Sequence, residues 1–315
     1  EYRYPQDSML ADVDIIVFDL QDLGCRIYTY IATLYFFSEA CAKLGIELWV
    51  LDRPNPAGRA IDGSYLEIGQ ESFVGCAPLP TQYGLTIGEL AHWFDFIIAE
   101  RGPNRVDLTV IPMSNYSMSG LGLGWPRDSR PWINPSPNAS SVNMCRCFPG
   151  TVLLEGTTLS EGRGTTTPLE MIGAPGMNPK AWLKALSEQA PTWLDGVIIR
   201  ECFFSPTFHK HVGELCTGLA FHTDYLDFQP AGFKPYRLIA GLLKVIRQQN
   251  PALDLWRNHD YEYELDRLPI DVINGGSYLR HWVDDPNSSF AEFDEMLQDA
   301  EHRWTQERAP FLIYQ

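Results

Sequence analysis

The sequence lacks the positive charge that a nucleic-acid-binding protein needs. It has 24 Lys and Arg against 40 Asp and Glu, a net charge of −16 at pH 7, and no run rich in Lys or Arg. Binding along a phosphate backbone depends on such residues, because they neutralise the phosphates. We therefore expect no nucleic-acid partner.

Long apolar runs are also absent. No uninterrupted apolar stretch approaches the roughly 18 to 20 residues that span a bilayer. The first residues, EYRYPQDSML, lack the charged and apolar regions of a signal peptide. We predict no membrane span. With 315 residues, 45% of them hydrophobic, the chain can bury a large core, and roughly 100 to 200 residues per domain predicts two domains.

The chain offers no grouping of Cys and His that is typical of a metal site. Its cysteines form no CxxC pair, and only one residue separates Cys145 from Cys147. His209 and His211 would share one face of a strand, but no acidic third ligand stands at an obvious spacing, so we favour a polar surface or hydrogen-bonded role for them. Most cysteines are expected to be buried small apolar residues. We predict no metal and no cofactor.

Short apolar stretches alternate with helical patterns in the first part of the chain. Strands are predicted at residues 13–20, 46–52 and 106–113, and helices at residues 30–45 and 86–102. Thr86 with Glu89 three residues later is a capping-box pattern. This alternation predicts an α/β fold with a Rossmann-like, mostly parallel sheet. Because a doubly wound sheet seldom begins with a buried strand after only a dozen residues, we expect further strands upstream of this sequence.

The pattern changes after residue 180. Strands are predicted at residues 197–208 and 214–224, and helices at residues 235–250 and 288–308. This indicates a second, smaller α+β domain, so the expected domains are residues 1–180 and 181–315. A loop at residues 117–138, rich in Gly, Pro and Trp, is of the kind that often covers a site.

Polar side chains follow each strand predicted before residue 160, except the one at 106–113. The clusters are Asp19, Gln21, Asp22 and Arg26 after the first strand, Asp52, Arg53 and Asn55 after the second, and Glu155, Glu161 and Arg163 after a further strand predicted at 151–154. Ligands of open α/β sheets bind beyond the carboxyl ends of the strands. We therefore expect the carboxyl groups of Asp22, Asp52 and Glu161 on one rim. A purely structural role in ion pairs or loop hydrogen bonds stays open.

The stretch LLEGTTLSEGRGTTTPLE, residues 153–170, combines three glutamates and an arginine with three glycines. Glycine is kept where the chain must turn tightly or approach something closely. The combination favours a ligand contact for Glu161 and Arg163. A phosphate-binding loop is the weaker reading, because the spacing is neither GxGxxG nor GxxxxGK[ST] and the glutamates repel phosphate.

Several motifs together resemble a known family. In chain order they are FDLQDLGCRIYTY, LDRPNP, GLTIGEL, PSPN, FPGTVLLEGTTLSEGRGTTTPLEMIGAP and KHVGELCTG. They are similar to the motifs of exo-β-N-acetylmuramidases of NamZ type, long catalogued as a domain of unknown function, DUF1343, and the likeness covers nearly the whole chain. The family usually carries a further N-terminal PEHG segment, and RHG where this sequence has Gln82, Tyr83 and Gly84.

The resemblance implies a bacterial glycoside hydrolase that releases N-acetylmuramic acid from the non-reducing end of peptidoglycan fragments, with its site in the interdomain cleft. The implied catalytic residues are Glu161, Asp22 and Glu155, and the implied substrate-binding residues are Arg163, Arg26, Asp52, Arg53 and Asn138. The implied partners are small peptidoglycan-derived saccharides. A periplasmic or secreted location is implied, while a cytoplasmic one and the oligomeric state stay open.

The chemistry of such a reaction constrains the residues that carry it. Glycoside hydrolysis needs an acid for the leaving oxygen and a second group, usually a carboxylate, for the oxocarbenium-like transition state. The acetamido group of the sugar can also serve as nucleophile, and the sequence leaves both routes open. Muramic acid carries a lactyl carboxylate, which Arg163 or Arg26 could bind in bidentate fashion. A non-catalytic sugar-binding protein with the same cleft is the alternative function.

Overall fold

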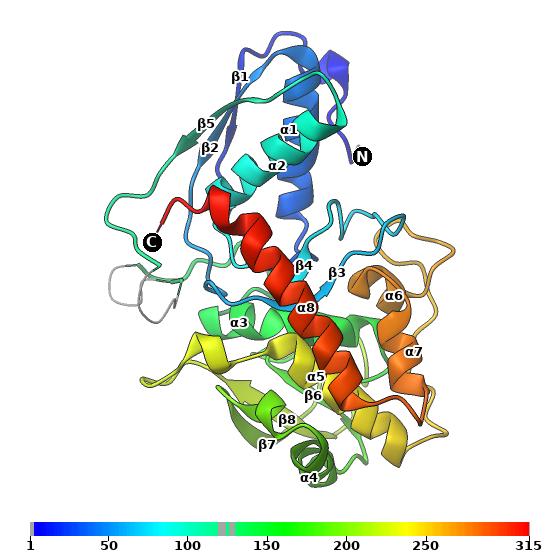
Figure 1. Cartoon of the computed structure of the whole chain (residues 1–315). Coiled ribbons are helices and arrows are strands. Elements are labelled where there is room, and N and C mark those ends of the chain that lie inside the picture. The colour runs from blue at the N-terminus through cyan, green and yellow to red at the C-terminus, as the bar shows by residue number, and fades with distance from the viewer. Residues whose placement is uncertain (1–2, 119–123, 126–129, 315) are drawn as a thin grey trace.

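The first half of the chain forms a parallel sheet covered by helices. The computed structural model describes residues 3–118, 124–125 and 130–314. The strands are β1 (Ile15–Phe18), β2 (Glu47–Leu51) and β5 (Asp107–Ile111), in the order β1-β2-β5. Both pairings are parallel, which confirms the three predicted strands and the Rossmann-like fold. The helices α1 (Tyr30–Leu44) and α2 (Ile87–Arg101) connect them (Figure 1).

Local sequence signals set the ends of these helices. Gly45 ends α1 in the left-handed conformation, at φ 70°, which glycine adopts without steric cost. The Thr86 side chain accepts a hydrogen bond from the Glu89 backbone, and the Glu89 side chain accepts one from Thr86, so the predicted capping box is confirmed. Because the Glu89 carboxylate also binds Arg59 and the backbone of Ile313, this cap ties the C-terminal end of the chain to α2.

The strand predicted at residues 151–154 is wrong. Helix α3 (Val142–Thr151) runs through Thr151 and continues into the 3-10 helix η2 (Val152–Gly156). A short apolar run does not distinguish a buried strand from a buried helical turn. Here the run from Val152 to Leu154 is fully buried as helix. The polar stretch after it therefore does not follow a strand of the parallel sheet.

The second half contains a small antiparallel sheet with helices. The strands are β6 (Met171–Pro175), β7 (Ile198–Phe204) and β8 (Cys216–His222), in the order β6-β8-β7. The helices are α4 (Pro179–Gln189), α5 (Pro235–Gln249), α6 (Pro269–Asn274), α7 (Tyr278–Asp284) and α8 (Phe290–Arg308). The predicted strands and both predicted helices of this half are thus present, with shorter bounds. Strand β6 lies before residue 180 but pairs with β8, which lies after it. The division into domains of residues 1–180 and 181–315 stays a prediction.

Shorter elements link the two halves. The antiparallel hairpin of β3 (Asp62–Tyr65) and β4 (Pro80–Gln82) lies between the parallel sheet and helix α5 (Figure 1). Four further 3-10 turns are η1 (Asp7–Met9), η3 (Pro191–Leu194), η4 (Pro230–Gly232) and η5 (Ala309–Phe311). None of the described helices is long and apolar enough to cross a membrane.

Two hydrophobic cores hold the halves, and α8 joins them. One core packs α1 and α2 on the parallel sheet, and the other surrounds α3 and α5. Phe293 and Leu297 of α8 lie in the second core, whereas Trp304 lies in the first and donates a hydrogen bond to the Tyr83 carbonyl at 2.7 Å. All seven cysteines are free and only Cys202 is partly exposed, as expected.

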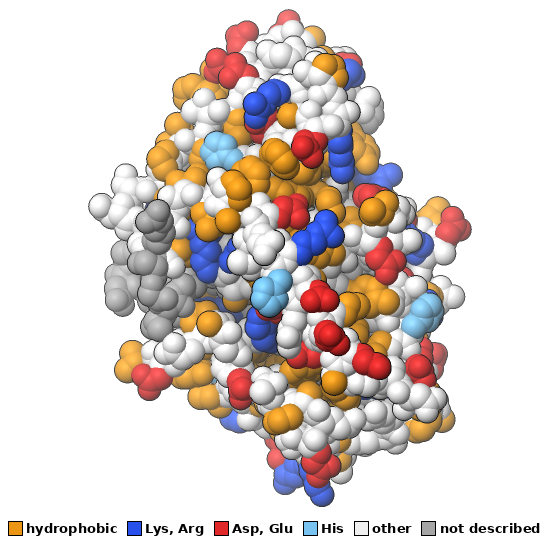
Figure 2. Space-filling view, viewed as in Figure 1, with side chains coloured by type: hydrophobic (Ala, Val, Ile, Leu, Met, Phe, Trp, Pro, Cys, Tyr) orange, Lys and Arg blue, Asp and Glu red, His pale blue; other side chains and the backbone are white. Residues whose placement is uncertain are grey.

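The face that carries α8 shows acidic and basic side chains interspersed (Figure 2). Ion pairs account for part of this pattern, for example Lys234 with Glu301 at 2.9 Å. The negative net charge is therefore partly balanced locally on this face.

Helices α3 and α5 approach so closely that only glycine fits between them. A Cβ on Gly150 would lie 1.9 Å from the Pro235 carbonyl oxygen, whereas a Cβ on Gly102 at the end of α2 would meet nothing within 4 Å. We predict that Gly150→Ala lowers the free energy of unfolding by about 1 to 3 kcal/mol, the usual range for overpacking. Gly102→Ala, the control, should stay within about 0.5 kcal/mol of wild type. Denaturant unfolding of both variants tests this, and equal stability would contradict the packing described.

Candidate functional site

Three of the predicted site residues line one pocket. Glu155, Arg163 and Asn138 border a cavity of about 260 Å³, together with Tyr261 and Glu262. We call it the Glu155 pocket. Its remaining walls come from residues 23 and 27–29, from residues 136–137, from apolar side chains of α3 and η2, and from Val74 and Leu169. A mostly apolar cavity with a few converging polar groups is the usual form of a small-molecule site.

The Glu155 carboxylate is held from two sides. Arg163 Nη2 donates to Glu155 Oε1 at 2.5 Å, and the Tyr261 hydroxyl donates to Oε2 at 2.8 Å. Burial, and then the charge of Glu155, raise the pKa of Tyr261 well above its usual value, so this hydroxyl stays a donor. These two contacts fix the orientation of the Glu155 side chain at the pocket wall.

Glu161 lies behind this wall and is fully buried. Its carboxylate forms ion pairs with Lys210 Nζ at 2.6 Å and with Arg163 Nε at 3.2 Å. Burial alone would raise the pKa of Glu161, but the charge of Lys210 and the contact with His209 outweigh it, and the pKa falls to about 2. Glu161 is thus ionised at neutral pH and braces Arg163. The catalytic role predicted for it stays a prediction.

Lys210 reaches Glu161 from a strained turn and not from a strand. His209 and His211, on either side of it, have φ values of 72° and 54°, in a region that few non-glycine residues occupy. Residues 205–208, expected in a strand, lie beyond the end of β7. Lys210 Nζ also donates to the carbonyls of Leu154 and Thr157. The turn that contains Lys210 therefore holds the first residues of the polar stretch 153–170 in place.

Asp22 is a buried acid beside the same pocket. Its Oδ2 accepts hydrogen bonds from the Gly24 backbone at 2.7 Å and from the Tyr83 hydroxyl, and its Oδ1 has no partner among the described residues. Burial raises the pKa of Asp22 to about 6. Leu23, the next residue, lines the pocket, whereas Asp22 itself does not.

Two other predicted residues make structural contacts. The Arg26 guanidinium is 1% exposed and donates to four backbone carbonyls, those of Ser64, Leu79, Ile273 and Asn274. Asp52 accepts from the Gly88 backbone and from Thr86 Oγ1, both 2.8 to 2.9 Å away, at the start of α2. Substrate contacts for Arg26 and Asp52 stay predictions, as does the common rim of Asp22, Asp52 and Glu161.

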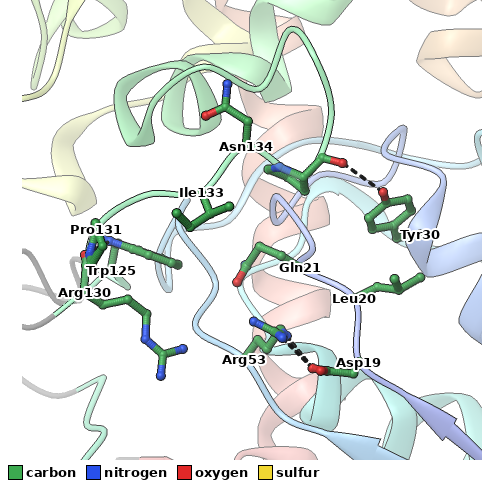
Figure 3. Close-up of a pocket in the computed structure, with 11 residues that line it drawn as sticks. Asp19, Leu20, Gln21, Tyr30, Arg53, Trp125, Arg130, Pro131, Ile133 and Asn134 are labelled. Carbon is green, nitrogen blue, oxygen red and sulfur yellow. Dashed lines mark hydrogen bonds and ion pairs between the residues drawn. The ribbon is translucent and has the colours of Figure 1, made fainter.

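Arg53 lines a second cavity, of about 480 Å³, which we call the Arg130 pocket. Arg53 Nε donates to Asp19 Oδ1 at 2.7 Å. Both residues follow strands of the parallel sheet, and Arg130 and Trp125 come from the opposite wall (Figure 3). The expected loop at 117–138 thus contributes to a cavity through residues 125, 130–131 and 133–135, while residues 119–123 and 126–129 lie outside the described part.

Sequence reasoning missed Tyr261 and Glu262. The stretch DYEYELD carries no motif, and its placement depends on a short bridge between Tyr261 and Glu264. Between them Glu262 and Tyr263 have φ values of 45° and 72°. A type I′ turn requires positive φ at both central residues, and Asn-Gly is the usual sequence there. Such strain persists where the surroundings over-determine it, often at functional sites. Burial, and then the charge of Glu155, raise the pKa of Glu262.

Over the part of the chain that the structure describes, no group of three or more His, Cys, Asp or Glu could hold a metal ion. The pocket chemistry consists of carboxylates, guanidinium groups and a phenol. Acid–base chemistry and anion recognition are what such an arrangement supplies.

Comparisons with known proteins agree on one family. A family model described as exo-β-N-acetylmuramidase NamZ, N-terminal, matches residues 1–143, and its C-terminal counterpart matches residues 146–314. The peptidoglycan β-N-acetylmuramidase NamZ of Bacillus subtilis (strain 168) is 35% identical over 99% of this chain and 70% of its own length. The two family models meet at the start of α3.

Solved structures of similar fold come from Bacteroides fragilis NCTC 9343. One DUF1343 family protein aligns with a TM-score of 0.81 at 25% identity, and a second with a TM-score of 0.75 at 27% identity. Each alignment covers 99% of this chain and 78% of the solved chain. The two-part architecture described above is therefore shared with these proteins.

The raised pKa of Asp22 makes stability depend on pH. Its folded pKa of about 6 exceeds its ordinary value of 3.8, so the stability it contributes is complete below about pH 4 and is lost as pH rises through 6. In Asp22→Asn the side-chain oxygen can keep both hydrogen bonds without the buried charge. We predict that this variant melts at a higher temperature than wild type at pH 8, with a smaller or reversed difference at pH 4.5.

Thermal melts of Asp22→Asn at both pH values test this prediction. The exposed Asp12→Asn is the matched control, because it removes the same charge from a solvated turn. A difference between Asp22→Asn and wild type that is the same at both pH values would show that Asp22 does not titrate as described.

Proposed function

Because the chain belongs to the NamZ family of exo-β-N-acetylmuramidases and is thereby a glycosidase, we propose that it releases N-acetylmuramic acid from the non-reducing end of peptidoglycan fragments. The observation that supports this beyond family membership is the Glu155 pocket, where two carboxyl groups in different environments face one cavity. Glycosidases use such a pair, one group as acid and one as carboxylate.

The size of the Glu155 pocket supports exo action. Its volume of about 260 Å³ is below the roughly 300 to 1,000 Å³ of pockets for drug-sized ligands. A cavity of this size suits one sugar unit better than several. We therefore place the reacting sugar there.

Within this proposal Glu262 is the general acid. Partial burial, and then the charge of Glu155, raise its pKa, which is the direction a general acid needs, and it lines the pocket while it keeps contact with solvent. Glu155, ion-paired with Arg163, is the carboxylate that supports the oxocarbenium-like transition state or orients the acetamido group. Either route needs these two groups in the same places.

The remaining predicted residues support that pair. Asn138 lines the pocket and can hydrogen bond to the sugar. Glu161 holds Arg163 in place, and Asp22 shapes the turn that leads into the pocket wall at Leu23. The periplasmic or secreted location expected from the resemblance remains a prediction.

The roles of the two carboxyl groups predict a separation of activity from stability. Glu262→Gln removes the proton but keeps the shape, so turnover of a muramic-acid-terminated disaccharide should fall by about 10²-fold or more with an unchanged melting temperature. Glu264→Gln, in the same turn but paired with Arg267 and outside the pocket, should keep wild-type turnover. Chromatographic detection of released N-acetylmuramic acid measures both.

Two results would contradict the proposal in different ways. Wild-type protein that binds the disaccharide but releases no muramic acid would establish the non-catalytic, sugar-binding alternative. Full turnover in Glu262→Gln would leave the glycosidase proposal intact and assign the acid to another residue.

A further inference from the structure

We propose that the Arg130 pocket is the subsite for the lactyl carboxylate of the muramic acid unit, with Arg130 as the residue that recognises it; this rests on the function proposed above. The pocket lies at the carboxyl ends of β1 and β2, which are followed by Asp19 to Gln21 and by Arg53. Ligands of open α/β sheets bind in this position. At about 480 Å³ it has ample room for such a substituent.

The charge of the Arg130 pocket suits an anion. Its charged residues, among those described, are Asp19, Arg53 and Arg130, which leaves a net positive charge. Arg53 is already paired with Asp19, at 2.6 Å between Nη2 and Oδ1. The Arg130 guanidinium has no ion-pair partner within the described chain, where its backbone carbonyl alone accepts a hydrogen bond, from Trp125. Figure 3 shows Arg53 and Arg130 extending toward the same space from opposite walls.

The Glu155 pocket, by contrast, is unsuited to a second anion. Its charged residues are Glu155, Glu262 and Arg163, and the guanidinium of Arg163 already contacts both Glu155 and Glu161. A carboxylate placed there would meet the Glu155 carboxylate, the carboxyl group of Glu262 and an arginine whose charge is compensated, which is unfavourable at short range. Arg26, the other arginine considered, is buried and donates from both terminal nitrogens to four backbone carbonyls, so it does not face this cavity. Among the described arginines that line the two pockets, Arg130 is the one without an ion pair to a described residue.

The two pockets adjoin along the chain. Residues 19–21 and 134–135 line the Arg130 pocket. The residues that follow each of them in the chain, 23 and 27–29 and then 136–138, line the Glu155 pocket. Tyr30 donates a hydrogen bond to the Pro135 carbonyl at 3.0 Å where these walls meet (Figure 3). Within this proposal the sugar ring lies in the Glu155 pocket and the acidic substituent extends toward Arg130.

The test compares sugars with and without the lactyl group. Calorimetry gives the Kd of N-acetylmuramic acid and of N-acetylglucosamine for wild type, Arg130→Gln and Arg130→Lys. Loss of a charged hydrogen bond should weaken muramic acid binding by about tenfold or more in Arg130→Gln. Arg130→Lys should recover part of this, since a point charge replaces a planar fork. Binding of N-acetylglucosamine should not change.

Arg105→Gln is the matched control, because this exposed arginine pairs with Asp95 away from both pockets and should bind both sugars like wild type. Equal weakening of both sugars in Arg130→Gln, or no weakening, would overturn the assignment. A lactyl-specific loss in Arg163→Lys with none in Arg130→Gln would place the carboxylate in the Glu155 pocket instead.

These outcomes separate the subsite from the proposed function. Binding is measured without turnover, so wild-type protein that binds muramic acid through Arg130 and releases none would refute the glycosidase and keep the subsite. Release of muramic acid with unchanged KM in Arg130→Gln would keep the glycosidase and refute the subsite. A substrate with a short peptide on the lactyl group adds a third arm: if its KM alone depends on Arg130, the recognised carboxylate belongs to the peptide, and the lactyl assignment fails.

Discussion

The packing of the two halves depends on the hydrogen bonds of one buried cation, Arg26. The Arg26 guanidinium donates to carbonyls of the β3–β4 hairpin and to the carbonyls that end α6, 247 and 248 residues away along the chain. The buried guanidinium in turn needs these acceptors, because a buried charge without hydrogen-bond partners is strongly destabilising. The residues that follow, 27–29, form a wall of the Glu155 pocket. Packing of the two halves and the position of that wall therefore rest on the same interaction.

The same requirement explains the polar stretch at residues 153–170. Buried charges must be paired, and Glu161 is surrounded by Lys210, Arg163 and His209 for this reason. Its network fixes Arg163, which in turn orients Glu155. Much of the charge that makes the stretch conspicuous thus maintains the loop, while Glu155 and Arg163 also reach a pocket.

Sequence patterns predicted the parts of the fold that local chemistry decides. Apolar runs located the three parallel strands, and the Thr86–Glu89 pair located the start of α2. The run at 151–154 misled because helix and strand bury it equally well. Contacts distant in sequence were not predictable: Lys210 beside Glu161 and Tyr261 beside Glu155 depend on turns with positive φ that no motif announces. Three predicted residues, Asn138, Glu155 and Arg163, nevertheless line one pocket.

An acidic protein that binds an acidic sugar faces opposing long-range electrostatics. The net charge of −16 repels anionic fragments at a distance, but salt screens exposed charges beyond about 8 to 10 Å. Within that distance the charge of the nearest residues determines whether an anion is attracted or repelled. The Arg130 pocket presents an uncompensated guanidinium among its described lining residues, and the Glu155 pocket an excess carboxyl group. Two adjoining cavities of opposite local charge can therefore bind the acidic and the neutral parts of one sugar in a single orientation, which is what cleavage of one particular bond requires.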